Sequence, residues 1–213
     1  NLKFWRKVSR RALKLYAKIQ CKNLNALTPS QSIKPFWLSC TNTTHLIHCQ
    51  QLIRVVPNKR WVFFATWQSR ETVIKLFKHV RHAEKELQGH QLLNKTNIAT
   101  PDILFHGWLQ GEGLYVIIYA RITPAHTVSE RWPQLHITAT LHQAGLQHND
   151  PHFKNFLITA QQKIIVLDCA AVSKNTRLKS INDYHKNLAQ LFVQLPANSV
   201  FPIEEYYRFY LQA

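Results

Sequence analysis

Three consecutive segments rich in β-branched and aromatic residues constrain the fold of this chain most. They are "HLIHCQQLIRVV" (45–56), "RWVFFATW" (60–67) and "TVIKLF" (72–77), separated only by residues 57–59 and 68–71. Residues of these types are enriched in strands, and connections this short join neighbouring antiparallel strands. The segments therefore predict an antiparallel sheet in the first half of the chain.

The rest of the chain mixes helical and strand patterns. Residues 79–101 place apolar side chains on one face and end at Pro101, which predicts a helix of several turns. Strand character returns over 102–109 and 113–122, and the patterns of 129–145, 181–195 and 203–213 are helical. Strands followed by helices predict an α+β protein with two lobes.

The composition restricts the partners and the setting. Lys and Arg total 27 against 11 Asp and Glu, which favours an anionic partner such as nucleic acid, a phosphorylated ligand or an acidic membrane. The four cysteines contain no CxxC pair, so zinc-ribbon and redox spacings are excluded and a reducing cytoplasm is expected. No apolar run reaches the roughly 20 residues that span a bilayer, and the N-terminus has no signal-peptide core. We expect a soluble or peripheral protein.

Residues 1–24 form a basic amphipathic pattern, with apolar residues at steps of three and four between lysines and arginines. Such a helix could lie on an anionic bilayer, or it could pack on the domain with a solvated basic face. Both interpretations stay open. A stretch between Pro29 and Pro35 is read as a linker, so residues 1–35 are expected to be helix and linker.

The segment "LQHNDPHFKNFLI" (146–158) carries the densest set of reactive side chains. His148, Asp150 and His152 offer metal ligands at short spacing, and His142 lies upstream. A structural zinc site needs four ligands, however, and a hydrolytic site usually gathers carboxylates and imidazoles from several segments. In a chain with twelve histidines such a cluster also arises easily by chance. The metal-cluster interpretation is therefore the less favoured one.

A second interpretation uses the two apolar runs that follow. "NFLI" and "IIVLD", separated by "TAQQK", predict a short hairpin that brings Asp150, Asn155 and Asp168 to one end. Carboxylate and amide oxygens suit Mg²⁺, which is bound by one or two protein carboxylates together with nucleotide phosphates. This arrangement predicts phosphoryl transfer.

The pattern H-x-D-x-x-x-x-N over His148, Asp150 and Asn155, followed by Asp168 at a strand end, resembles the catalytic and metal-binding loops of protein kinases. The resemblance implies that Asp150 takes the proton of the acceptor hydroxyl. It also implies that Asn155 and Asp168 hold Mg²⁺, and that His148 and His152 support the loop.

The same resemblance assigns the nucleotide-binding residues. Lys75 in "VIKLF" stands on a strand like the kinase lysine, and Glu86 on the next helix is the expected ion-pair partner, with Glu84 as the alternative. Lys75 would hold the α- and β-phosphates of ATP. Residues 115–122 would form the hinge that binds adenine, with Tyr119 and Arg121 as nucleotide-binding residues.

"DPHFKNFLI", together with "VLDCAAVSKNTRLKSINDYHKNLAQL", resembles the bacterial lipopolysaccharide core kinases, and most of all the heptose kinases among the Kdo and heptose kinase family. That family implies a protein-kinase-like fold with a β-rich N-lobe (36–119) and a reduced helical C-lobe (120–213). It also implies ATP and Mg²⁺ as cofactors and an inner-core sugar hydroxyl as acceptor. The expected location is the cytoplasmic face of the bacterial inner membrane.

The chain departs from the kinase pattern at three places. Asn149 replaces the usual arginine, Cys169-Ala170 replace Phe-Gly, and no G-x-G-x-x-G precedes Lys75, where "LSCTNTTHL" (38–46) is a poor substitute. A pseudokinase therefore stays open. A kinase of a small alcohol or aminoglycoside also stays open, because the loops of that class share the H-x-D-x-x-x-x-N pattern. A basic nucleic-acid-binding protein that stacks bases on Trp61, Phe63 and Trp67 is the less favoured alternative from another class.

Overall fold

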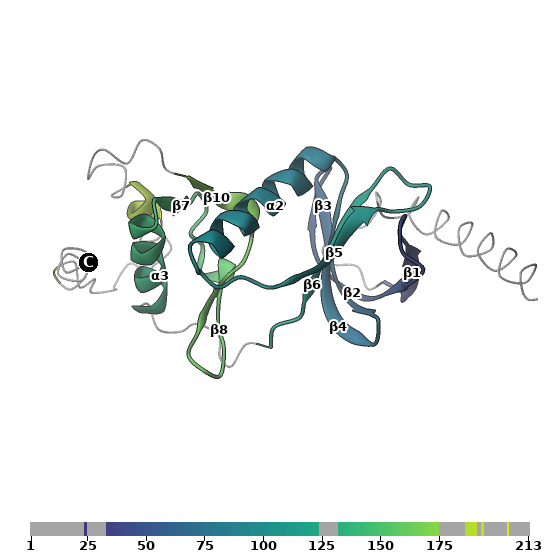
Figure 1. The fold of residues 1–213 in the computed structure, drawn as a ribbon, viewed down its shortest axis with the longest axis horizontal. Helices are drawn as coiled ribbons and strands as arrows, with labels where there is room; N and C mark the ends of the chain where they lie inside the picture. Colours follow the sequence, from purple (N-terminus) through teal and green to yellow (C-terminus); the bar gives the residue numbers. More distant parts are fainter. Residues whose placement is uncertain are drawn as a thin grey trace, which may run out of the picture. The chain divides into compact units, whose positions relative to one another are not determined.

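The computed structural model describes residues 33–123, 132–174 and 186–190, together with Leu24, Val193 and Glu204. The chain divides into two compact units, one of residues 1–84 and 102–121 and the other of residues 85–101 and 122–213. Figure 1 labels the helices and strands and colours them by their position in the sequence. Nearly all of the helices predicted over 1–24 and 203–213 and the linker before Pro35 lie outside the described residues.

The first unit is built on one six-stranded antiparallel sheet of strand order β1-β2-β3-β4-β6-β5. All three strands predicted in the first half are present. β4 begins two residues earlier than predicted, because only Gln68 and Ser69 form the turn before it. The bounds are β1 Phe36–Ser39, β2 Leu46–Val56, β3 Arg60–Trp67, β4 Arg70–Phe77, β5 Ile103–Trp108 and β6 Tyr115–Ala120.

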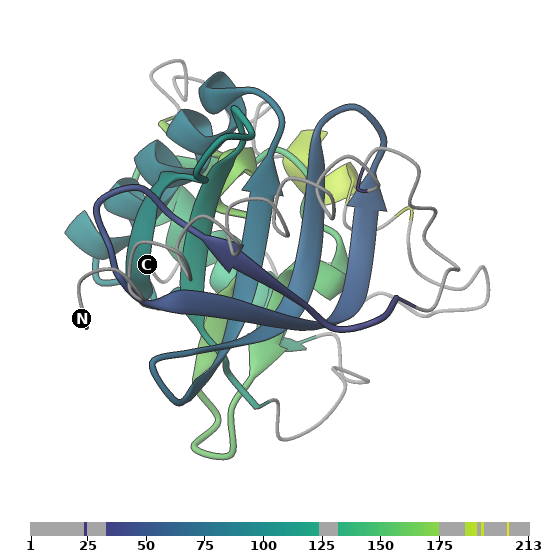
Figure 2. The same cartoon turned by 90° about the vertical axis from the view of Figure 1, so that its right-hand side faces the viewer.

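Strand β1 was not predicted, and it joins the two edges of this sheet. Cys40, just after β1, forms an isolated antiparallel bridge with Leu109, just after β5. The Thr41 N–H donates to the Trp108 carbonyl at 2.8 Å, and the Gln110 N–H donates to the Ser39 carbonyl at 2.9 Å. Figure 2 looks onto β1, the purple strand that crosses in front of the other strands of this unit. The bridge pairs edge groups that would otherwise stay open.

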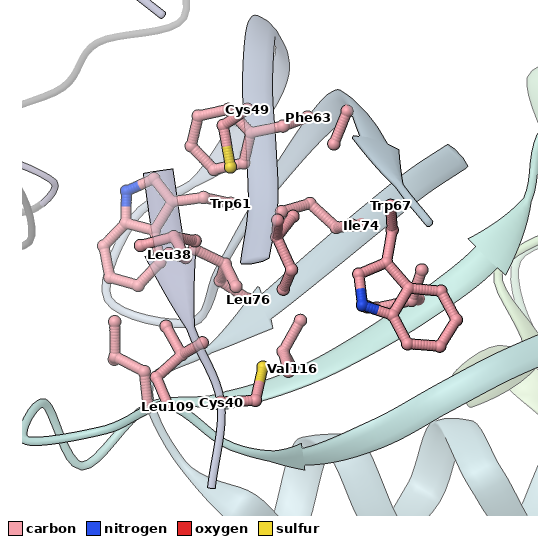
Figure 3. Packing of buried hydrophobic residues seen from close by; sticks show 14 of the residues in the cluster. Leu38, Cys40, Cys49, Trp61, Phe63, Trp67, Ile74, Leu76, Leu109 and Val116 are labelled. Carbon is pink, nitrogen blue, oxygen red and sulfur yellow. The ribbon is translucent and has the colours of Figure 1, made fainter. Parts of the chain in front are cut away.

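Alternate residues of β3 form the centre of the first unit's core. Trp61, Phe63 and Trp67 are 3%, 0% and 7% exposed, and they pack with Ile74 and Leu76 of β4 (Figure 3). Successive strand residues point to opposite faces, so these aromatic rings all point inward. A buried ring cannot stack on a base. The alternative in which Trp61, Phe63 and Trp67 bind nucleic acid is therefore wrong.

Helix α2 (Val80–Lys95) is shorter than the predicted helix 79–101. Its last turn is capped by Thr96, whose hydroxyl donates to the carbonyls of Leu92 and Leu93 at 3.0 Å each. Asn97 then adopts a left-handed φ of 57°, which ends the helical path. The boundary between the two units falls within α2, after Glu84.

The second unit combines helices with two small strand pairs. Helix α3 (Trp132–Gln143) precedes strand β7 (Leu146–His148), which pairs with β10 (Val172–Lys174). Strand β8 (Phe156–Ile158) pairs with β9 (Ile164–Val166), as the predicted hairpin requires. Two 3₁₀ turns, η1 (Phe153–Asn155) and η2 (Cys169–Ala171), precede β8 and β10.

The second unit has its own core, formed by α2, α3 and the short strands. Its buried apolar side chains include Leu93, Leu141, Leu146, Phe156 and Val166. In the part of the chain that the structure describes, no helix has the length and apolar character needed to cross a bilayer.

Candidate active site

Two polar segments of the second unit leave the same end of the strand pairs. In the β7–β10 pair, His148 at the end of β7 lies opposite Val172 at the start of β10. In the β8–β9 pair, Phe156 at the start of β8 lies opposite Val166 at the end of β9. The connections 149–155 and 167–171 therefore meet at one end of the strands. Asp150 and Asn155 lie on the first connection, and Asp168 lies on the second.

Asn155 fixes the backbone and the carboxylate of Asp150. Its Nδ2 donates to the Asp150 carbonyl oxygen at 2.8 Å and to Asp150 Oδ2 at 3.3 Å. The connection is also tightened by two backbone bonds of 2.7 Å, from the His152 N–H to the Asp150 carbonyl and from the Asn155 N–H to the His152 carbonyl. Because the amide nitrogen of Asn155 faces Asp150, the amide oxygen is the group left to face a cation.

Asp168 stands at a strained position two residues after the end of β9. Its backbone is left-handed, with a φ of 43°, which costs a residue with a Cβ roughly 1–2 kcal/mol. Leu167, the residue before it, donates its N–H to the Asn155 carbonyl at 2.7 Å, and the Ala171 N–H donates to the Asp168 carbonyl at 2.9 Å. These bonds hold the strained residue beside the Asn155 connection, as is common where backbone strain serves a functional site.

His148 is buried close to Asp150 and Asp168. The side chain is 0% exposed, its ring packs on Phe156 with centroids 5.4 Å apart, and its Nε2 lies 3.4 Å from the Leu167 carbonyl oxygen. Burial lowers the pKa of His148, against smaller opposing contributions from that carbonyl and from the Asp168 and Asp150 carboxylates. The burial and the contact with the Leu167 carbonyl are compatible with a residue that supports the loop, and this role of His148 stays a prediction.

The three histidines at positions 142, 148 and 152 each bind a different partner. His148 binds the Leu167 carbonyl, His152 Nδ1 accepts the Lys154 N–H at 3.1 Å, and His142 Nε2 lies 3.1 Å from Asn187 Oδ1. Among the residues described, no group of three or more His, Cys, Asp or Glu side chains could hold a metal ion. The less favoured interpretation, a metal site built on His148, Asp150 and His152, is therefore not supported.

Glu86 is tied to the turn that follows Asp168. Its side chain is 0% exposed, and its Oε2 accepts the backbone N–H of Ala170 at 3.2 Å. One turn further along α2, a Cβ on Gly89 would lie 1.8 Å from the Cys169 carbonyl oxygen, so only glycine fits there. Glu84, the alternative to Glu86, is exposed. The only sequence signal for Gly89 was a glycine inside a helical pattern.

Lys75 and Tyr119 share one face of the first unit's sheet. Lys75 on β4 pairs with Val62 and Ile117, and its Nζ lies 5.2 Å from the centre of the Tyr119 ring. Glu86 belongs to the other unit, so the predicted Lys75–Glu86 ion pair stays a prediction. Strands β2 and β3 are joined by the tight turn Pro57-Asn58-Lys59, which contains no glycine. Residues 38–46 comprise the end of β1, the connection 40–45 and the first residue of β2.

The side chain of Arg121 makes two contacts within the first unit. Its guanidinium pairs with Glu71 at 3.3 Å and lies 4.3 Å from the centre of the Phe64 ring. These contacts fix the chain just after β6. The predicted role of Arg121 in nucleotide binding stays a prediction.

Two asparagines make hydrogen bonds around the connection 149–155 that the sequence patterns do not predict. Asn149 stands where kinases carry arginine, and its Nδ2 donates to the Ala171 carbonyl at 2.8 Å and to Ser173 Oγ at 3.0 Å. Asn187 is 5% exposed and donates to the His148 carbonyl at 2.7 Å. Nothing in the local pattern of residues 181–195 distinguishes Asn187 from a surface amide.

The chain resembles known kinase-like proteins. Residues 95–200 match the family described as the ABC1 atypical kinase-like domain. No curated protein matches the chain. A solved structure described as "WaaP in complex with acyl carrier protein" is similar at 16% identity with a TM-score of 0.55, over 76% of this chain and 78% of that chain.

Two further solved structures are similar over smaller parts of their length. "Co-crystal structure of WbdD and kinase inhibitor LY294002" matches at 17% identity with a TM-score of 0.45, over 70% of this chain and 39% of that chain. "Structure of vaccinia related kinase 3" matches at 14% identity with a TM-score of 0.41, over 73% of this chain and 57% of that chain. The family match and the WaaP likeness confirm the predicted α+β, protein-kinase-like fold.

Proposed function

We propose that this kinase-like protein transfers a phosphoryl group from ATP to a sugar hydroxyl of the lipopolysaccharide inner core. The observation that carries the proposal is the contact of Asn155 with Asp150, beside the connection that holds Asp168. Phosphoryl transfer requires a carboxylate at the acceptor hydroxyl and oxygen ligands for the metal of the nucleotide, in one place.

The residues at this end of the strands fit Mg²⁺. Asn155 offers its amide oxygen and Asp168 a carboxylate, which are the hard oxygen donors that Mg²⁺ prefers. Few protein ligands are expected, because Mg²⁺ in such sites completes its shell with phosphate oxygens and water. When bound, the ion would neutralise charge on the transferred phosphate.

Asp150 is the proposed base. It is exposed at the tip of the connection, and Asn155 holds its backbone and one carboxylate oxygen. An acceptor hydroxyl can therefore approach a carboxylate whose position is fixed. Burial lowers the pKa of the nearby His148, so its ring is a weak base and leaves the acceptor proton to Asp150.

Lys75, Glu86, Tyr119 and Arg121 form the proposed nucleotide site. Lys75 would hold the α- and β-phosphates, with Glu86 as its partner. Residues 115–122 would supply backbone groups to adenine, and the Arg121–Glu71 pair would keep the end of this segment in place. The glycine-free turn 57–59 argues for fewer backbone contacts to phosphate than in other kinases.

The acceptor class rests on the D-P-H-x-x-N-F pattern of Asp150–Phe156 and on the charge of the chain. An excess of 16 positive charges suits an acceptor that carries phosphates and carboxylates. Residues 1–24 would adhere to the anionic cytoplasmic face of the bacterial inner membrane. Removing these residues should weaken binding to anionic vesicles, and unchanged binding would exclude that role.

Labelled ATP tests this function. The protein with γ-labelled ATP, Mg²⁺ and dephosphorylated core lipopolysaccharide should transfer label, and Asp150→Ala and Asp168→Ala should abolish the transfer. Asp102→Ala, which removes an exposed carboxylate of the first unit, is the matched control and should retain it. Equal labelling by all three variants would exclude the mechanism. Absence of a nucleotide-dependent shift in the melting temperature would indicate a pseudokinase.

A further inference from the structure

We propose that Asn187, within the helical residues 186–190, is a positioning residue for phosphoryl transfer, holding His148 and through it the two connections that carry Asp150 and Asp168. The inference rests on the proposed function. It adds a residue from the C-terminal part of the chain to the catalytic loop.

Asn187 occupies the centre of a buried polar chain. Its Nδ2 donates to the His148 carbonyl at 2.7 Å, and its Oδ1 lies 3.1 Å from His142 Nε2. The side chains of Asn187, His142 and His148 are 5%, 2% and 0% exposed. His148 in turn contacts the carbonyl of Leu167, the residue before Asp168. One amide therefore connects helix α3, the helical residues 186–190 and both active-site connections.

The two hydrogen bonds of this side chain, one donated and one accepted, require an asparagine. A carbonyl oxygen can only accept, so the amide nitrogen of Asn187 must face His148 and its oxygen must face His142. His142 must then carry its proton on Nε2 and donate it. A neutral His142 agrees with its burial, which lowers its pKa to about 4. Only a side chain that donates and accepts at the same point satisfies both partners.

The consequence for catalysis follows from the position of His148, two residues before Asp150. If the His148 carbonyl loses its donor, it must move to find another or stay unsatisfied in the interior. Either change shifts the backbone that carries Asp150. Displacement of a reacting group by about 1 Å costs on the order of 10²-fold in rate.

The Asn187→Asp variant tests the inference because it keeps the shape and the acceptor but removes the donor. The kcat should fall at least tenfold, while the KM for ATP changes less than about twofold. Asn187→Gln, which keeps both groups on a longer stem, should recover part of the rate. Ala189→Ser, on the exposed side of the same helical segment, should match the wild type. In an Asp150→Asn background, Asn187→Asp should cause little further loss.

Hydrogen exchange gives a second readout that does not depend on activity. Asn187→Asp should speed exchange of the amides of residues 148–155 relative to wild type and to Ala189→Ser, whether or not the protein transfers phosphate. Unchanged exchange in these amides would overturn the inference, and so would an unchanged kcat in an active protein. If the wild type transfers no phosphate but exchange rises as expected, the proposed function fails and the structural role of Asn187 stands.

Discussion

Glu86 and Ala170 are joined by a hydrogen bond in which the buried carboxylate accepts the backbone N–H at 3.2 Å. Ala170 lies two residues after Asp168, so the helix that carries Glu86 is fixed to the segment that carries the proposed metal ligand. In protein kinases the position of this helix controls whether the lysine–glutamate pair forms. Here the bond to Ala170 sets the position of Glu86.

Glu86→Gln should therefore lower kcat/KM by roughly tenfold or more, because the charge that would pair with Lys75 is lost while a hydrogen-bond acceptor remains. The measurement is steady-state transfer from ATP. Glu84→Gln is the matched control on the same helix, where the glutamate is exposed, and should stay within about twofold of wild type. Equal losses for the two variants would reject Glu86 as the partner of Lys75.

Gly89→Ala should destabilise the second unit. In most helices this substitution stabilises by about 1 kcal/mol. Here the added Cβ would lie 1.8 Å from the Cys169 carbonyl oxygen, so α2 or η2 must shift. We expect a loss of about 1–3 kcal/mol in the free energy of unfolding, measured by urea denaturation.

The exposed Gln88 gives the control for this change. Gln88→Ala should alter the free energy of unfolding by less than about 0.5 kcal/mol. If Gly89→Ala proved neutral or stabilising, α2 and η2 would not pack as closely as the structure shows.

The features predicted correctly from the sequence depend on residues near one another in the chain. The alternation in 60–67 predicts β3, and the hairpin of β8 and β9 brings Asn155 and Asp168 together across a five-residue turn. Local patterns of this kind predict the structure correctly, because the residues that determine it lie close together in the sequence.

The features that were missed depend on distant partners. Strand β1 exists through pairing with β2 and the bridge of Cys40 to Leu109, and Asn187 acquires its role from a carbonyl 39 positions earlier. Pro101 predicts the end of α2, because proline is a strong helix-ending signal, but Thr96 and Asn97 end the helix first. No periodic pattern in the local sequence indicates contacts between residues so far apart in the chain.

Acid should destabilise the protein through His142. Burial lowers the pKa of His142 from 6.5 to about 4, so the unfolded chain takes up a proton that the folded chain resists. The contribution is fully present above pH 6.5 and is lost as the pH falls from 6.5 toward 4, by about 3 kcal/mol at most. The buried His148, whose pKa is also lowered, acts in the same direction.

Urea denaturation at a series of pH values measures this effect. His142→Gln keeps a donor for Asn187 but cannot titrate, so it should flatten the dependence between pH 6.5 and 4. His136→Gln, an exposed histidine on the same helix, should leave the dependence as it is in wild type. A curve for His142→Gln that follows the wild type would show that other groups cause the acid sensitivity.

Asn155→Asp should separate the two roles proposed for this residue. The substitution removes the donor to the Asp150 carbonyl and carboxylate and sets a second carboxylate beside the base. It leaves an oxygen ligand for Mg²⁺ in place. We expect kcat to fall on the order of 10²-fold while the Mg²⁺ concentration for half-maximal rate does not rise. Asp168→Asn, which weakens the proposed metal ligand, should raise that concentration. Asn42→Asp, in an exposed turn of the first unit, should change neither quantity. If Asn155→Asp keeps the wild-type kcat, its bonds to Asp150 do not orient the base.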